Sequence, residues 1–170
     1  MKLANRILQV NHAGEHGAVN IYAGQLALAK FTAQDLLTEL SEFQTHERSH
    51  RALFQAELAR RQIRPCLSYA LCGYAGYGLG VLSAMLGRSA IAATSYAVEH
   101  VVLQHLQQQL VQLKHSDKQA YHTVHAIIAD EQAHHDRAAS QINHQHPVLR
   151  LYISAVSAIT EVVIWLGMRL

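Results

Sequence analysis

The chain has 170 residues, of which half are hydrophobic and 15% are charged, and its formal net charge is +2. This length suits one substantial core, so we expect a single domain over residues 1–170. The basic residues are scattered rather than clustered, which argues against a nucleic-acid partner. The two cysteines, Cys66 and Cys72, lie in an apolar stretch without a second pair, so neither a disulfide framework nor a zinc ribbon is indicated.

The composition and the apolar periodicity predict an all-α protein. Five helical segments are expected, at residues 3–29, 33–62, 66–113, 117–143 and 148–168. The third is long enough to break near Gly87. Thr32 and Ser116 have the sequence pattern of helix N-caps and are expected to open the second and fourth segments.

Two segments are unusually apolar. The stretch from Leu67 to Gly87 carries no charge and is long enough, as a helix, to cross a bilayer. Gly76 and Gly80 within it have the spacing that permits close helix packing, and no preceding strand supports a phosphate-binding loop. The last segment contains Glu161 and Trp165, which is more typical of an interfacial anchor than of a membrane span.

These two helices exceed the needs of a four-helix core, so we expect them to associate with a membrane; the alternative is ordinary core and dimer packing. The amino-terminal residues have neither the apolar run of a secretory signal nor the composition of a transit segment. The expected location is therefore the cytoplasmic face of the cell membrane, as a peripheral protein.

Each of the first four predicted segments carries one glutamate on its inward, apolar face. These residues are Glu15, Glu47, Glu99 and Glu131. A histidine follows the second and the fourth glutamate by three residues, which places His50 and His134 on the same helix faces. Within each half of the chain the two glutamates are 32 residues apart, with a predicted turn midway, so antiparallel hairpins bring them to one depth. The whole pattern repeats with an offset of 84 residues.

Four buried carboxylates at one depth repel one another unless cations balance them. The faces that carry them hold two imidazoles and no lysine or arginine between the ligand positions. Two divalent metal ions would balance the charge, and mixed carboxylate and imidazole ligands suit iron or manganese better than zinc. This is the ligand arrangement of ferritin-like di-iron bundles. The predicted metal ligands are Glu15, Glu47, His50, Glu99, Glu131 and His134.

Other polar residues have less specific patterns. Tyr22 lies on the same face as Glu15, as a candidate hydrogen-bond partner or a radical or proton relay, with core packing as the simpler interpretation. Asp130 and Asp136 could orient an imidazole, although solvated helix charges explain them more simply. Most other histidines are expected on the surface. They are His12, His16, His46, His100, His115, His122, His125, His135, His144 and His146.

Four strings around the glutamates resemble the demethoxyubiquinone hydroxylase family of ubiquinone biosynthesis. They are NHAGEHGAVNIYAGQ, HERSH, AVEHVVLQH and DEQAHHD, in chain order. The resemblance extends from about residue 5 to the end and includes the glycine-rich apolar segment and the closing helix.

The resemblance implies a ferritin-like four-helix bundle with additional membrane-associating helices, and a peripheral membrane monooxygenase. Such an enzyme hydroxylates the ring of a polyprenyl demethoxy-benzoquinol with O2, two iron ions and an external reductant. The resemblance assigns the metal to the same six residues, with the four glutamates also counted as catalytic. It places His105 at a histidine linked to electron delivery; many members follow it with tyrosine, but this chain has Leu106, which puts a relay through that tyrosine in doubt.

The partners expected from the resemblance are the benzoquinol substrate, the membrane lipid surface, a ubiquinone-biosynthesis complex and a second copy of the chain. Three alternatives remain open at this point. One is a ferritin- or rubrerythrin-like iron oxidase, which shares the metal site. Another is a di-iron hydroxylase of modified tRNA, which needs a basic groove. The third is a purely structural membrane bundle, which would bind no stoichiometric iron.

Overall fold

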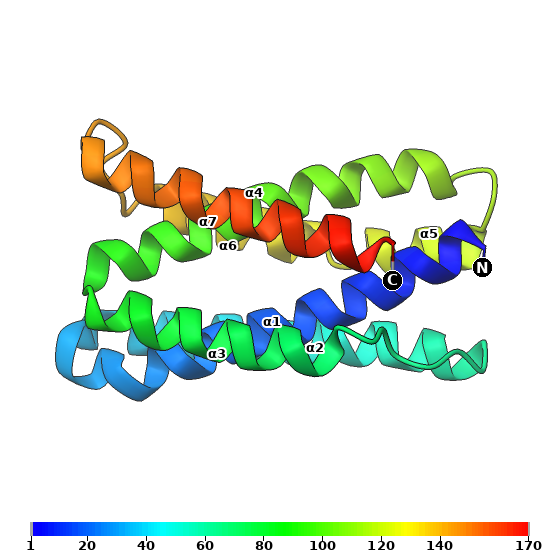
Figure 1. Ribbon diagram of the computed structural model, residues 1–170, viewed down its shortest axis with the longest axis horizontal. Coiled ribbons are helices and arrows are strands. Elements are labelled where there is room, and N and C mark those ends of the chain that lie inside the picture. Colours follow the sequence, from blue (N-terminus) through cyan, green and yellow to red (C-terminus); the bar gives the residue numbers. More distant parts are fainter. Residues whose placement is uncertain (1, 170) are drawn as a thin grey trace.

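The computed structural model describes residues 2–169, and all regular elements in that range are helical (Figure 1). They are α1 (Leu3–Thr32), the short 3-10 helix η1 (Gln34–Leu36), α2 (Leu37–Arg60), α3 (Tyr69–Met85), α4 (Arg88–Leu113), α5 (Lys118–His125), α6 (Ile128–Ala139) and α7 (Pro147–Gly167). The predicted all-α fold is confirmed.

Four helical rods form the core, namely α1, α2, α4 and the pair α5 and α6. Outside this core α3 packs along α1, and α7 packs along α4 (Figure 1). The 84-residue offset therefore relates three helices in each half, because it carries α1, α2 and α3 onto α4, α5–α6 and α7. The two apolar helices thus occupy equivalent outer positions on a ferritin-like bundle. The sequence predicted this four-helix core and two apolar helices in addition to it.

The long third segment breaks at Gly87, as predicted. Gly87 has a φ of 93°, a backbone conformation that favours glycine. The fourth segment differs from the prediction, because α5 and α6 are separate helices with a break at Ala126 and Ile127. Neither residue is a glycine or a proline, and both keep right-handed helical angles, so the interruption is local and has no simple sequence signal.

Both predicted N-caps are wrong, although the turns lie where they were expected. The hydroxyls of Thr32 and Ser116 donate to carbonyl oxygens four residues earlier, at 3.3 and 2.7 Å. Each side chain therefore completes the end of the preceding helix rather than opening the next. The N-cap of α5 is Asp117, whose carboxylate accepts a 3.0 Å hydrogen bond from the backbone N–H of Ala120.

Glycines determine how closely α3 approaches α1. A Cβ at Gly76 would collide with the carbonyl oxygen of Gly17, and a Cβ at Gly80 with that of Ile21. These are contacts with backbone atoms, which cannot move away as a flexible side chain can. The predicted role of Gly76 and Gly80 in close helix packing is therefore confirmed, with α1 as the partner.

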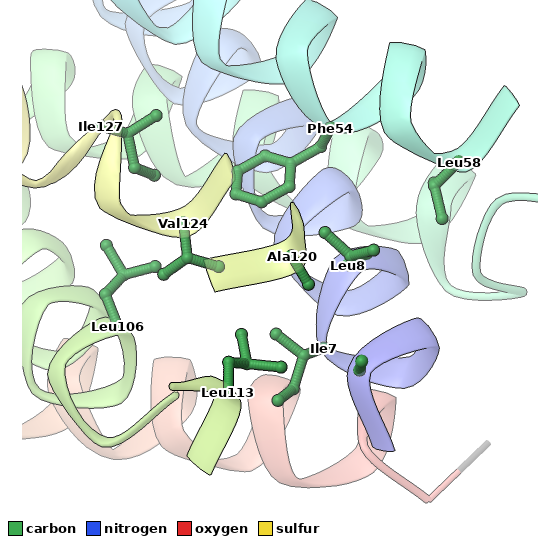
Figure 2. Close-up of a cluster of buried hydrophobic side chains, with 10 residues drawn as sticks. Ile7, Leu8, Phe54, Leu58, Leu106, Leu113, Ala120, Val124 and Ile127 are labelled. Carbon is green, nitrogen blue, oxygen red and sulfur yellow. The ribbon is translucent and has the colours of Figure 1, made fainter. Parts of the chain in front are cut away.

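Four clusters of buried apolar residues are found among residues 2–169, and the two largest lie at different depths. Figure 2 shows the first, where side chains from α1, α2, α4 and α5 converge. Its members are Ala4, Ile7, Leu8, Phe54, Leu58, Leu106, Leu113, Ala120, Val124 and Ile127. The second cluster consists of Tyr22, Ala29, Ala33, Leu36, Leu40, Phe43, Ala84 and Ile91. The depth between the two clusters is occupied by buried polar side chains.

The outer faces of α3 and α7 expose large apolar side chains. They include Leu71, Tyr74, Leu82 and Met85 on α3, and Leu151, Ile159, Val162 and Trp165 on α7. By length and composition, α7 is the one helix among residues 2–169 that could cross a membrane, and only 6% of its most apolar stretch is buried. It is therefore not an ordinary core helix.

Candidate metal centre

The six predicted ligands meet between the two apolar clusters. Glu15 comes from α1, Glu47 and His50 from α2, Glu99 from α4, and Glu131 and His134 from α6. All six side chains are buried. The regular rise of each helix and the position of the hairpin turns bring them to one depth, as the 32-residue spacings predicted.

The six residues form two overlapping groups in which the candidate ligand atoms all lie within 4.8 Å of one another. The first group is Glu15, Glu47, His50 and Glu131. The second is Glu47, Glu99, Glu131 and His134. Glu47 and Glu131 belong to both groups and would help to hold a metal ion at either position. We call the position beside Glu15 and His50 position A, and the position beside Glu99 and His134 position B.

Each histidine directs its Nδ1 atom toward the carboxylates. His50 Nδ1 lies 2.9 Å from Glu131 Oε1 and 3.7 Å from Glu15 Oε2. His134 Nδ1 lies 3.1 Å from Glu47 Oε1. The contacts are crossed, because each histidine approaches the glutamate that precedes the other histidine. Both halves of the chain are therefore needed to complete either position.

The electrostatics of the pocket reflect burial and mutual repulsion. Burial, and then the neighbouring glutamates, raise the pKa of Glu47 well above its usual value. Burial and Glu131 do the same for the pKa of Glu99. For His50 burial acts to lower the pKa, but the close, oppositely charged carboxylates of Glu131 and Glu15 raise it to about 11. The raised pKa values of Glu47 and Glu99 favour their protonated forms, which reduces the repulsion between carboxylates.

Several buried atoms in the pocket have no hydrogen-bond partner. They are Glu47 Oε1, both carboxylate oxygens of Glu131, His50 Nδ1 and His134 Nδ1. Unpaired polar atoms at such depth are costly, and these converge on the same small region. A divalent cation at each position would accept their lone pairs and offset the repulsion between carboxylates. The oxygen-rich donor set with one imidazole per position fits iron or manganese.

A second layer of side chains contacts the candidate ligands. The hydroxyl of Tyr22 donates a 3.0 Å hydrogen bond to Glu99 Oε1, so Tyr22 is a ligand partner as well as a core residue. His50 Nε2 lies 3.1 Å from Asp130 Oδ2, which agrees with the interpretation that this aspartate orients an imidazole. Asp136 also contacts an imidazole, but that of His135, at 2.9 Å, which is not one of the candidate ligands.

Most of the other histidines are exposed, as the sequence predicted, but His12 is buried, and His16, His46 and His135 are partly buried. His46 is partly buried, and its Nδ1 lies 3.0 Å from His134 Nε2. His12 is 2% exposed and stacks on Tyr69, with 4.7 Å between ring centroids. Burial and then Arg51 lower the pKa of His12 to about 4. The sequence carried little signal for either role, since both depend on which neighbouring helix covers the residue.

His105 lies away from the six ligands. Its Nε2 lies 2.8 Å from Glu161 Oε2 on α7, and the imidazole is partly exposed. Leu106, the next residue, packs in the first apolar cluster. The pair of His105 and Glu161 therefore joins α4 to the outer helix α7, and a link to electron delivery stays a prediction.

The fold and this buried set of carboxylates and imidazoles define a ferritin-like protein with a pocket able to hold metal ions. The profile of the family described as ubiquinone biosynthesis protein COQ7 matches residues 2–167, and the chain belongs to that family. The family resemblance of the four sequence strings is thereby confirmed.

Curated relatives cover nearly the whole chain. It is 33% identical to the NADPH-dependent 3-demethoxyubiquinone 3-hydroxylase of Dictyostelium discoideum, over 99% of this chain and 78% of the relative. It is 32% identical to the 3-demethoxyubiquinol 3-hydroxylase of Rhodospirillum rubrum, over 98% of this chain and 78% of the relative. It is 29% identical to the NADPH-dependent 3-demethoxyubiquinone 3-hydroxylase of Homo sapiens, over 98% of this chain and 77% of the relative.

Proposed function

We propose that this protein is an O2-dependent monooxygenase that hydroxylates the ring of a polyprenyl demethoxy-benzoquinol in ubiquinone biosynthesis. The observation that carries the proposal is the pair of overlapping, buried ligand groups in a chain whose relatives are named as hydroxylases of this substrate. One oxygen atom of O2 would enter a ring C–H bond and the other would leave as water, with two electrons from an external reductant. The names of two relatives specify NADPH, which is therefore the reductant to test first.

Each candidate ligand has a distinct place in this proposal. Glu47 and Glu131 would contribute to both iron positions, whereas Glu15 and Glu99 would each contribute to one. A histidine would complete each position, and the iron pair would supply O2 activation. The protein keeps the ligands in place, since each half contributes to both positions. The two apolar clusters above and below the carboxylates exclude water from the reaction.

Residues outside the ligand set have supporting roles. Tyr22 would hold Glu99 in one orientation through its hydrogen bond, and so keep the ligand geometry defined. His105, joined to Glu161 near the surface, is the proposed point at which electrons enter. We also propose that residues 1–170 act as one domain, because α1 and α2 supply ligands to a site that α4 and α6 complete.

We further propose a peripheral location at the cytoplasmic face of the cell membrane, with α3 and α7 against the lipid. A substrate with an isoprenoid tail resides in the bilayer, and these two helices carry most of the exposed large apolar side chains. Arg169 lies 3.8 Å from the centroid of the Trp165 ring, an aromatic and cationic pairing that suits the level of lipid head groups. Membrane lipid, a ubiquinone-biosynthesis complex and a second copy of the chain are the proposed partners.

The first experiment is anaerobic loading with Fe(II), followed by metal analysis, Mössbauer spectroscopy and an assay with a short-chain demethoxy-benzoquinol, O2 and NADPH. We expect about two irons per chain and a hydroxylated product, and we expect Glu131→Ala to bind little iron and form no product. Iron oxidation that proceeds without a hydroxylated quinol would instead indicate an iron oxidase. Failure to bind iron would refute the proposed function.

A further inference from the structure

The internal repeat allows positions A and B to be compared residue by residue. Position A has Glu15 and His50, and adding the offset of 84 residues gives Glu99 and His134 at position B. The ligands are identical in type, so any difference between the two positions must come from the side chains that contact them. Two pairs of equivalent contacting side chains differ, and both differences make the ligands of position A the stronger electron donors.

The first pair consists of His46 and Asp130, each of which directly precedes the glutamate of a Glu-x-x-His sequence. Their contacts are crossed between the halves. Asp130 lies 3.1 Å from Nε2 of His50, and His46 lies 3.0 Å from Nε2 of His134. The residue before each of these glutamates thus contacts the ligand histidine of the other half of the chain. This residue is a carboxylate, Asp130, beside His50 and an imidazole, His46, beside His134.

The chemistry of these two contacts is different. Both ligand histidines direct Nδ1 inward, so with a metal ion bound at Nδ1 the neutral imidazole would carry its proton on Nε2 and donate it to the outer contact. His50 then donates to an anionic carboxylate, which increases the electron density on its Nδ1 atom. His134 donates to Nδ1 of His46, which can accept only as a neutral imidazole and therefore adds no charge. Asp130 has a side chain that is 48% exposed, so solvent reduces its effect without removing it.

The second pair concerns the terminal glutamates. Tyr22 donates a hydrogen bond to Glu99, and a donated hydrogen bond withdraws electron density from a carboxylate. The counterpart of Tyr22 in the other half is Leu106, which has no group to donate and packs in the first apolar cluster. Glu15 therefore has no equivalent hydroxyl donor, and it remains the stronger electron donor of the two terminal carboxylates.

We infer that the two metal positions are chemically unequal, with position A binding a divalent cation first and more tightly, and position B filling second and emptying first. Asp130 and His46 are the positioning residues that create most of this difference. The inference rests on the proposed metal pair and extends it, because identical ligand sets alone would give two equal positions.

The test measures two stepwise affinities in the absence of O2. The purified chain is titrated with Fe(II), and separately with Mn(II), in competition with a chelating indicator. We expect two resolved steps. Asp130→Asn should weaken the tighter step by about 10- to 100-fold and leave the weaker step nearly unchanged. His46→Asp, which places a carboxylate at the equivalent position, should tighten the weaker step. Each substitution brings the two affinities closer together.

Matched controls separate these effects from general changes in charge or stability. Asp136→Asn alters an aspartate of the same helix that pairs with His135, and His122→Asp alters an exposed histidine of α5. Neither should shift either step. With one equivalent of ⁵⁷Fe(II), the Mössbauer spectrum of the parent chain should show one dominant quadrupole doublet, and that of His46→Asp two of similar intensity. Circular dichroism confirms the helical content of every variant.

Two outcomes would overturn the inference. Equal affinities in the parent chain, with Asp130→Asn weakening both steps alike, would show that the outer contacts do not distinguish the positions while the metal pair itself stands. Absence of any stoichiometric binding of Fe(II) or Mn(II) would refute the proposed metal centre and this inference with it. If Asp130→Asn does not fold, the effect of His46→Asp on the weaker step decides the question alone.

Discussion

The hydroxyl of Tyr22 on α1 donates a 3.0 Å hydrogen bond to Glu99 Oε1 on α4, so a residue of the first half of the chain supports a candidate ligand of the second half. Both side chains are buried, and no solvent competes for the bond. Burial and the charge of Glu99 raise the pKa of Tyr22 well above its usual value, so the phenol stays protonated as a donor.

Tyr22→Phe should keep the fold and both metal ions but lower the rate of quinol hydroxylation by roughly 10-fold, because Glu99 loses its fixed orientation. The free energy of unfolding should fall by about 1 kcal/mol. Steady-state kinetics, iron analysis and thermal unfolding measure the three quantities. Tyr121→Phe on α5 is the control, and equal loss of activity in both variants would contradict a specific role for Tyr22.

The metal-free protein should become less stable as the pH rises above about 4.5. The pKa of Glu47 is raised in the folded state by burial and by other glutamates, so the unfolded chain loses this proton first. The pKa of His50, raised to about 11, adds stability that is complete below 6.5 and is lost as the pH rises toward 11. The lowered pKa of His134 opposes this trend only below 6.5.

Calorimetry in the presence of a chelator should therefore show a melting temperature at pH 8 that is roughly 5 °C below the value at pH 6. Glu47→Gln should flatten this dependence and raise the melting temperature of the metal-free protein at pH 8. Metal-loaded parent protein should show the opposite trend, because metal ions bind the deprotonated ligands. If the melting temperature of metal-free Glu47→Gln changes with pH as much as that of the parent protein, the raised pKa of Glu47 is not the cause of the pH dependence.

Two glycines of α3 provide a matched test of its packing against α1. Gly80→Ala should lower the free energy of unfolding by about 1–3 kcal/mol, because the added Cβ meets the backbone of α1 at Ile21. Gly78→Ala should raise it by about 0.5–1 kcal/mol, because that position is open and alanine favours helix. Urea unfolding of both variants measures the difference. The same effect at both positions would refute the close approach of the helices.

Membrane association should depend on the outer face of α7. Leu151→Glu introduces a charge at a side chain that is 72% exposed, and it should reduce co-sedimentation with anionic lipid vesicles by about 10-fold. Val111→Glu on α4, at a side chain that is 76% exposed, is the control and should bind vesicles like the parent chain. Point charges are preferable to deletion of α7, which would uncover the apolar side chains of α4. Unchanged binding of Leu151→Glu would exclude this face as the lipid contact.

Much of the candidate site was accessible from the sequence because it depends on regular geometry. A glutamate and a histidine three residues apart share a helix face wherever the helix lies, and a turn midway between Glu15 and Glu47 sets their common depth. The break at Gly87 and the close packing at Gly80 were accessible for a similar reason, since only glycine meets those backbone requirements.

Other features required the tertiary structure. Whether Thr32 ends one helix or begins the next depends on a local competition for hydrogen bonds that the cap pattern does not resolve. The crossed contacts of His46 and Asp130, the burial of His12 and the pairing of His105 with α7 depend on the rotation and stagger of one helix relative to another. The sequence by itself determined which residues share each helix face, because helical periodicity is a property of the local chain. The tertiary structure decided which faces meet, because that depends on packing between helices far apart in the sequence.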